Sequence, residues 1–222
     1  MEMLSFDCVH DALQAMTEQL AAAVRQKTDG PFHIALSGGS GRRNMYGKSR
    51  GHGCASIGST NDASRRTTRK AISNMPTNCC FKRSASPTTT CSGYGAKRIP
   101  NKKPGATRRP SELPLQDGLP RFDAVVLGIG DDGHTASIFP HTPGLLTDPA
   151  CYAVSRHPVT GQWRITMTGP LILNGAELLF PVIGPGKAEI LQKIDGPQGA
   201  EYPAGYILRR AERAAVYTNC KI

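Results

Sequence analysis

Long apolar runs are missing from this 222-residue chain, and no stretch approaches the roughly 18 to 20 apolar residues of a membrane-spanning helix. Aromatic residues are also scarce, at 6% of the chain with a single tryptophan. The seven cysteines are odd in number and include no Cys-x-x-Cys pair, which argues against a disulfide framework and against a zinc site. The first residues, Met1 to Asp7, are acidic and lack the apolar core of a signal peptide, so we expect a cytoplasmic protein that contacts no membrane.

A central segment, residues 41–110, lacks leucine, valine and glutamate altogether. It carries 16 of the 27 lysines and arginines but only one of the 17 acidic residues, Asp62, so its formal charge is +15. Since the whole chain is +10, the remainder is −5, as in an ordinary acidic enzyme. No helical or strand periodicity persists in the segment for more than a few residues.

Two interpretations of this basic segment compete. One is a disordered insert that binds nucleic acid or another acidic surface. Because the segment has only three aromatic residues and no nucleic-acid-binding motif, we do not expect nucleic acid as a partner. The other is translation out of frame. If permitted codons for residues 58–64 are read from the third base of each codon, they encode Val-Asp-Glu-Arg-Cys-Val. The same frame restores valine before these residues and glutamate and leucine after them. We favour the frameshift, which predicts a polypeptide that is poorly folded in its middle and weakly active or inactive.

The rest of the chain alternates strand, loop and helix. Apolar periodicity predicts a helix over residues 7–25, with Asp7 or Asp11 as its cap. Strands are expected over residues 32–36, 123–127, 163–168, 177–183 and 214–218. Further helical segments are expected from His134, over 170–176 as a short helix or turn, and over 188–194, with loops over 113–120 and 184–187. This alternation predicts one α/β domain over residues 1–222, with a doubly wound, mainly parallel sheet and a disrupted or disordered middle segment.

The strand over 123–127 ends in a long motif that combines glycine, aspartate and histidine. The motif is Gly128-Ile129-Gly130-Asp131-Asp132-Gly133-His134-Thr135-Ala136-Ser137-Ile138-Phe139-Pro140. An imidazole titrates near neutrality, so His134 suits a general base, and Asp132 could orient its ring. The structural alternatives are that His134 makes local hydrogen bonds at the start of a helix, and that Asp131 and Asp132 are helix N-caps. The N-terminus of such a helix would also favour a bound anion.

A second glycine-rich loop, Ser37-Gly38-Gly39-Ser40, follows the strand over 32–36. Its backbone N–H groups and hydroxyls suit a phosphate, especially if a helix begins next. The alternative is a plain turn, because short glycine-rich loops are weak motifs.

Four stretches together resemble the 6-phosphogluconolactonase family: Leu36 to Ser40, Leu127 to Pro140, Arg164-Ile165-Thr166 and Gly186-Lys187-Ala188. The related glucosamine-6-phosphate deaminases share the Gly-x-Gly-x-Asp-Gly-His core but continue with Ile-Ala-Phe-Asn-Glu-Pro, whereas this chain continues with Thr-Ala-Ser-Ile-Phe-Pro. The resemblance covers residues 1–40 and about 111–218. It implies a Rossmann-like, sugar-phosphate isomerase-like fold, no metal or other cofactor, and hydrolysis of 6-phospho-D-glucono-1,5-lactone to 6-phosphogluconate in the pentose phosphate pathway.

The resemblance also implies roles for particular residues. His134 would activate water, with Asp132 as its partner. The substrate phosphate would be bound by Ser37, Gly38, Gly39, Ser40, Arg164 and Lys187. Arginine offers phosphate a bidentate fork and lysine a point charge. Without the resemblance, these two cations would be interpreted as solvated surface charges.

Departures from the family pattern lie in the basic segment. The Asp-Glu-Arg loop expected after the second strand appears only in the alternative frame, and Gly41-Arg42 stands where the family has Thr-Pro. We expect a monomer that acts on a sugar-phosphate lactone; a glucosamine-6-phosphate deaminase-like isomerase and a basic nucleic-acid-binding protein are the alternatives. The other histidines are interpreted as surface or structural residues: His10, His33, His52, His141 and His157.

Overall fold

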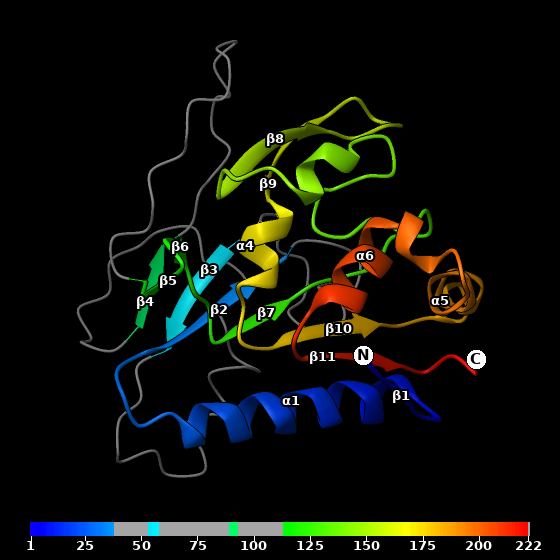
Figure 1. Ribbon diagram of the computed structural model, residues 1–222. Coiled ribbons are helices and arrows are strands. Elements are labelled where there is room, and N and C mark those ends of the chain that lie inside the picture. Colours follow the sequence, from blue (N-terminus) through cyan, green and yellow to red (C-terminus); the bar gives the residue numbers. More distant parts are fainter. Residues whose placement is uncertain (38–52, 58–88, 93–112, 222) are drawn as a thin grey trace.

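A computed structural model of the chain describes residues 1–37, 53–57, 89–92 and 113–221, and for 53–57 and 89–92 it describes the backbone alone (Figure 1). The predicted loop residues Gly38, Gly39 and Ser40, and most of the basic segment, lie outside the described residues. The described part is built on one seven-stranded sheet.

Five strands of this sheet run parallel, which confirms the predicted mainly parallel sheet; four of the five were predicted, and the first was not. They are β1 (Glu2–Ser5), β2 (Phe32–Leu36), β7 (Ala124–Val126), β10 (Leu178–Val182) and β11 (Ala214–Thr218). The strand order is β1-β11-β10-β7-β2-β3-β4. The last two strands, β3 (Gly53–Ile57) and β4 (Thr89–Ser92), are antiparallel and differ from the expectation of no strand within residues 41–110. Ladder hydrogen bonds are made by backbone groups, so the edge of β2 can pair with a segment that has no apolar pattern.

Helices cover both faces of the sheet, which confirms the doubly wound prediction (Figure 1). Helix α1 (Val9–Gln26) covers one face, and α4 (Gly169–Leu173), α5 (Ala188–Asp195) and α6 (Pro203–Arg210) cover the other. Side chains alternate between these layers: Val125 packs in the cluster that holds Ile190 and Ile207, whereas Val126 packs in the cluster that holds Met16. A one-residue slip in register would reverse this arrangement, so the buried faces fix the pairing.

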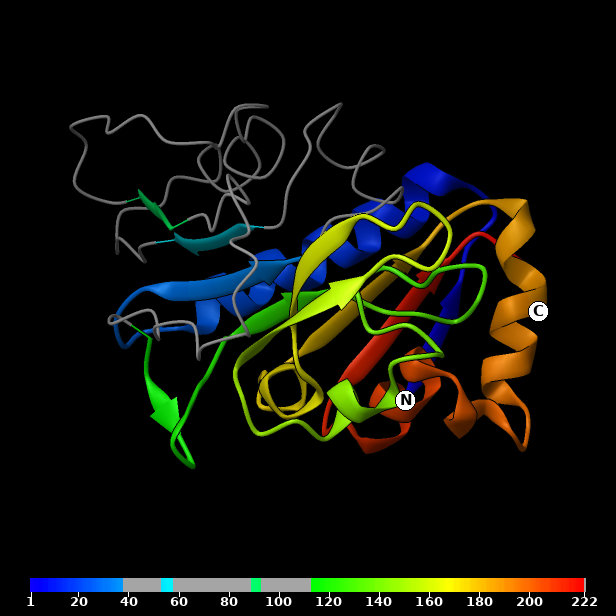
Figure 2. The same ribbon diagram turned by 90° about the horizontal axis from the view of Figure 1, so that it is seen from above.

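An antiparallel hairpin lies over the α4–α6 side, separate from the main sheet (Figures 1 and 2). Its strands are β8 (Tyr152–Arg156) and β9 (Trp163–Met167). The strand predicted over 163–168 therefore forms, but as part of this hairpin and not of the parallel sheet. A smaller hairpin of β5 (Leu115–Gln116) and β6 (Leu119–Pro120) replaces part of the loop predicted over 113–120.

The predicted cap of the first helix is wrong. Cys8 is the N-cap, and its sulfur accepts a hydrogen bond from the Asp11 N–H at 3.4 Å, so Asp11 lies within the first turn. Short 3-10 helices complete the fold: η1 (Pro143–Leu146), η2 (Pro185–Lys187) and η3 (Gly199–Glu201). Among the helices that the structure describes, none combines the length and the apolar character needed to cross a bilayer.

Candidate active site

The loop that follows β7 begins at the carboxyl edge of the sheet, where β2 and β7 end side by side. The Ser37 N–H donates to the Val126 carbonyl at 2.9 Å, and the Leu127 N–H donates to the Leu179 carbonyl at 2.9 Å. β2 and β7 therefore end together just before Gly128, and β10, which pairs with β7 at Leu178 and Leu179, continues to Val182. In open α/β sheets, the carboxyl ends of the strands are where ligands bind.

The helix predicted from His134 does not form. Thr135 makes isolated β-bridges with Ile129 and with Ile138, and Ala136 has a left-handed φ of 51°. The loop closes on itself because the Gly130 N–H donates to the His134 carbonyl at 2.9 Å. Because no helix begins at His134, the alternative that Asp131 and Asp132 are helix N-caps is wrong, and the helix N-terminus expected at this point does not form.

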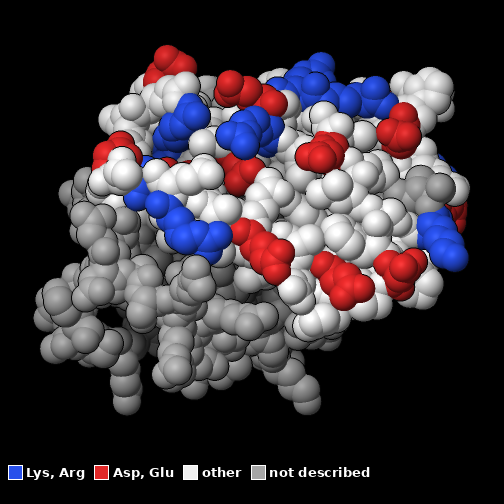
Figure 3. Space-filling model, turned by 90° about the horizontal axis from the view of Figure 1, so that it is seen from below, with Lys and Arg blue, Asp and Glu red and all other residues white. Residues whose placement is uncertain are grey.

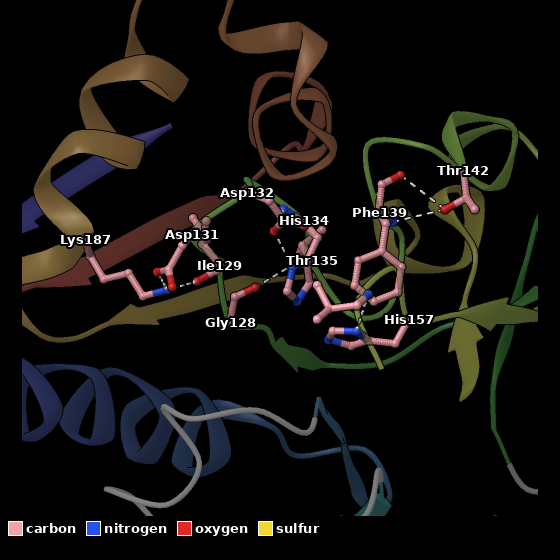
Figure 4. A network of polar contacts seen from close by, with 11 residues as sticks. Gly128, Ile129, Asp131, Asp132, His134, Thr135, Phe139, Thr142, His157 and Lys187 are labelled. Carbon is pink, nitrogen blue, oxygen red and sulfur yellow. Dashed lines mark hydrogen bonds and ion pairs between the residues drawn. The ribbon is translucent and has the colours of Figure 1, made fainter. Parts of the chain in front are cut away.

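Asp132 and His134 form the central contact of the loop (Figure 4). His134 Nδ1 lies 2.5 Å from Asp132 Oδ1, and the His134 N–H donates to the same oxygen at 3.2 Å. Burial would raise the pKa of the Asp132 carboxyl, but the hydrogen bond and charge of the His134 ring, with the His134 backbone N–H, outweigh it and lower that pKa. Asp132 is thus a carboxylate that holds Nδ1 of the imidazole and leaves Nε2 as the outer ring nitrogen.

Two glycines make room for this pair. A Cβ atom on Gly130 would lie 2.1 Å from His134 Nδ1 and 2.6 Å from Asp132 Oδ1. Gly133 has φ +77°, and a Cβ there would lie 2.5 Å from the Tyr202 ring. The Gly133 carbonyl also accepts a hydrogen bond from the Ala204 N–H at 3.0 Å, so the first turn of α6 supports the loop.

Lys187 reaches the same loop from η2. Its ammonium donates to the Ile129 carbonyl at 2.7 Å and to Asp131 Oδ1 at 2.6 Å (Figure 4). The Lys187 side chain is 15% exposed and the Asp131 side chain 86%, so the lysine is held in place while its carboxylate partner faces solvent. Because exposed ion pairs are weak, an incoming anion can replace Asp131 on the ammonium.

The β8–β9 hairpin borders the site through His157 and Arg164. The buried Phe139 ring links His157 to the Asp132–His134 pair: its centroid lies 4.7 Å from that of His134 and 5.3 Å from that of His157. Partial burial lowers the pKa of His157, the positive charges of Arg164 and His134 lower it further, and the Asp132 carboxylate opposes them. No sequence motif marks His157, and only the folded hairpin reveals its position.

The predicted site residues thus fall into three groups. Asp132 and His134 touch, and Lys187 contacts their loop. The Ser37 N–H donates to the last residue of β7, and Arg164 lies in β9 of the hairpin, where its charge lowers the pKa of His157. Gly38, Gly39 and Ser40 lie outside the described residues, so their predicted phosphate role stays a prediction. Within the described ranges, no group of three His, Cys, Asp or Glu side chains is arranged to hold a metal ion.

Comparison with known proteins gives one matching family. Residues 66–217 match the family described as glucosamine-6-phosphate isomerases/6-phosphogluconolactonase. This match begins inside the basic segment and extends into β11.

Individual relatives are similar over a shorter stretch. The 6-phosphogluconolactonase of Treponema pallidum is 44% identical over 93 residues, which are 42% of this chain and 39% of that relative. The one from Synechocystis is 42% identical over 96 residues, again 42% of this chain and 39% of the relative. The matched stretch therefore spans about two fifths of the length of these curated relatives. The solved structure of 6-phosphogluconolactonase from Trypanosoma brucei has a TM-score of 0.62 at 17% identity and covers 98% of this chain and 95% of its own, which supports the Rossmann-like fold.

Proposed function

The chain belongs to the family of glucosamine-6-phosphate isomerases/6-phosphogluconolactonase, and we propose that it hydrolyses 6-phospho-D-glucono-1,5-lactone to 6-phosphogluconate in the pentose phosphate pathway. The observation that carries this proposal is the 2.5 Å contact between Asp132 and His134 at the end of a parallel strand. The names of the Treponema and Synechocystis relatives favour lactone hydrolysis over the other activity of the family.

In the proposed reaction, Asp132 accepts the Nδ1–H of His134, so the Nε2 lone pair is free to take a proton from water. The water oxygen bonds to the lactone carbonyl carbon and gives a tetrahedral intermediate. When that intermediate collapses, the bond between this carbon and the ring oxygen breaks, and the ring oxygen takes the proton back from the imidazolium. Asp132 stays ionised because its pKa is lowered, and its charge stabilises the imidazolium.

The proposed phosphate anchor consists of Lys187 and Arg164, together with the loop from Ser37 to Ser40. Support comes from the Lys187 ammonium, which is fixed beside the catalytic loop and bonded to an exposed carboxylate. A phosphate dianion offers this ammonium more charge than Asp131 does, so substrate would displace the carboxylate.

Replacing His134 tests the proposed base. We expect His134→Ala to lower kcat by about 10²- to 10⁴-fold, the usual contribution of general base catalysis. The measurement is formation of 6-phosphogluconate above the spontaneous rate, with an unfolding curve for each variant. His141→Ala is the matched control, because His141 is exposed and stacks on the same Phe139 ring at 5.6 Å. Unchanged activity in a folded His134→Ala variant rejects the assignment.

Two other functions are separated by direct assays. Ammonia release from glucosamine 6-phosphate, without lactone hydrolysis, would identify a deaminase-like isomerase. Nucleic-acid binding whose affinity falls steeply with salt would identify a basic binding protein.

We further propose that the protein is a monomer and lies in the cytoplasm. Light scattering tests the oligomeric state, and cell fractionation tests the localisation.

A further inference from the structure

His157 follows β8 and opens the turn of the β8–β9 hairpin. Its backbone N–H donates to the Gln162 carbonyl at 2.9 Å, and its own carbonyl accepts the Gly161 N–H at 2.9 Å. The ring is tied to the same turn, because Nδ1 faces the N–H groups of Val159 and Thr160, each at 3.2 Å. An aspartate or asparagine oxygen makes the same kind of turn with the backbone that follows it.

These two contacts fix the tautomer of the imidazole. A backbone N–H can only donate, so Nδ1 of His157 must be the acceptor and carries no proton. The ring proton therefore lies on Nε2, at the far edge of the ring. The low pKa of His157, caused by partial burial and by the charges of Arg164 and His134 against the opposing Asp132, keeps the ring neutral in this form.

The fixed ring lies beside the candidate catalytic pair. The Phe139 ring contacts the rings of both His134 and His157, with centroid distances of 4.7 and 5.3 Å. In Figure 4, both imidazoles lie against Phe139, and the His157 ring extends toward the side of His134. The electrostatic coupling of His157 to His134 and Asp132 agrees with this placement.

We propose that His157 is a further substrate-contacting residue, whose Nε2–H donates a hydrogen bond to a hydroxyl or phosphate oxygen of the bound sugar phosphate. This inference rests on the proposed function for the identity of the ligand. A rigid neutral donor suits an uncharged sugar oxygen or a phosphate oxygen already paired with a cation, because its orientation is set before the ligand arrives. His157 orients and binds in this role, and it takes no proton from the reacting water.

Two substitutions separate the donor from the turn that holds it. His157→Asn places a side-chain oxygen where Nδ1 lies, so it preserves the acceptor for Val159 and Thr160 but removes the outer donor. His157→Gln places an amide nitrogen near the position of Nε2, so it restores the donor. One hydrogen bond contributes about 0.5–1.5 kcal/mol, so we expect His157→Asn to weaken ligand binding by about three- to ten-fold. His157→Gln should recover most of this loss.

The affinity of the full chain for the product, 6-phosphogluconate, gives a readout that does not depend on turnover. Trp163 is the single tryptophan of the chain and lies opposite Arg156 in the same hairpin, so its fluorescence reports binding. For the lactone, we expect KM to rise in His157→Asn while kcat stays within about two-fold, since a contact present equally in ground and transition states alters KM alone. His141→Asn is the matched control and should leave the Kd unchanged.

Nitrogen-15 NMR of the histidine rings tests the geometry directly. We expect His157 to be in the Nε2–H form at neutral pH and its Nε2 resonance to shift when 6-phosphogluconate saturates the protein. An Nδ1–H form, or a wild-type Kd in a folded His157→Asn variant, overturns the inference while leaving the lactonase proposal intact. If the wild-type chain neither hydrolyses the lactone nor binds 6-phosphogluconate, both proposals fail together.

Discussion

Gly130, in the loop after β7, occupies a position where no side chain fits. A methyl group on Gly130 would lie 2.1 Å from His134 Nδ1, which is less than the separation of any two unbonded heavy atoms. The backbone at Gly130 thus passes directly beneath the Asp132–His134 contact, and the pair can form only because no side chain intervenes.

We expect Gly130→Ala to displace the imidazole and to lower kcat by at least about ten-fold, because misplacing a catalytic group by 1 Å can cost about 10² in rate. The measurement is lactone hydrolysis, with thermal unfolding recorded in parallel. Gly128→Ala is the control from the same loop, because its added Cβ would have no heavy atom of the described residues within 4 Å. Equal activity in the two variants would show that the pair tolerates displacement.

At the scale of single side chains, the sequence motif predicts the pairing of Asp132 with His134 but not the residues that surround the pair. His134 and Asp132 are two residues apart, so a tight turn suffices to bring them together. The ion pair between Lys187 and Asp131 joins residues 56 positions apart, and no motif spacing predicts it. His157 carries no motif at all, because its tautomer depends on a hairpin turn and its position depends on packing against Phe139.

Helix α6 shows how close packing can reverse an ordinary helix preference. Gly205 lies in the first turn of the helix, and within helices alanine is normally favoured over glycine by up to about 1 kcal/mol. Here, however, an added Cβ would lie 1.9 Å from the Gly199 carbonyl oxygen of η3. The helix and the preceding turn are therefore in backbone contact.

We expect Gly205→Ala to lower the free energy of unfolding by about 1–3 kcal/mol, because overpacking outweighs the gain in helix preference. Urea unfolding monitored by circular dichroism measures this change. Gly144→Ala in η1 is the matched control, since its Cβ would have no neighbour within 4 Å among the described residues, and we expect a change within about 0.5 kcal/mol. A stabilised Gly205→Ala variant would contradict the packing argument.

The elements with a strong apolar period were predictable and the others were not. α1, β2, β10 and β11 show clear patterns and form within two residues of their predicted bounds. Helix α6 lacks a predictive pattern because it begins with Pro203 and contains Gly205, although proline at the first helical position is compatible with a helix. The edge strand β1 is four residues long and only half-buried, so its pairing with β11 determines its conformation.

Charge is unevenly distributed over the molecule as a whole. The face that carries α1 shows lysine and arginine interspersed with aspartate and glutamate over the described surface (Figure 3). The excess of +15 belongs to residues 41–110, most of which lie outside the described residues. The nucleic-acid alternative therefore depends on that segment alone.

The frameshift interpretation gives a test for the whole chain. We expect a version translated in the alternative frame over residues 41–110 to have a higher kcat/KM for the lactone than the 222-residue chain, because it restores the Asp-Glu-Arg loop. The measurement compares both proteins, with His134→Ala in each as the inactive reference. Gene sequencing supplies the complementary check: a DNA sequence whose other frame lacks Val-Asp-Glu-Arg contradicts the interpretation, as does full activity of the chain as written.

β1 is synthesised long before β11, the strand with which it pairs. The two strands are more than 200 residues apart, and the Ser5 hydroxyl donates to the Cys220 carbonyl at 2.8 Å. On a ribosome that adds about 5–20 residues per second, the first strand waits roughly 10–40 s for its partner. β1 therefore joins the sheet only after β11 has been synthesised, and it stays without its β11 partner throughout that interval.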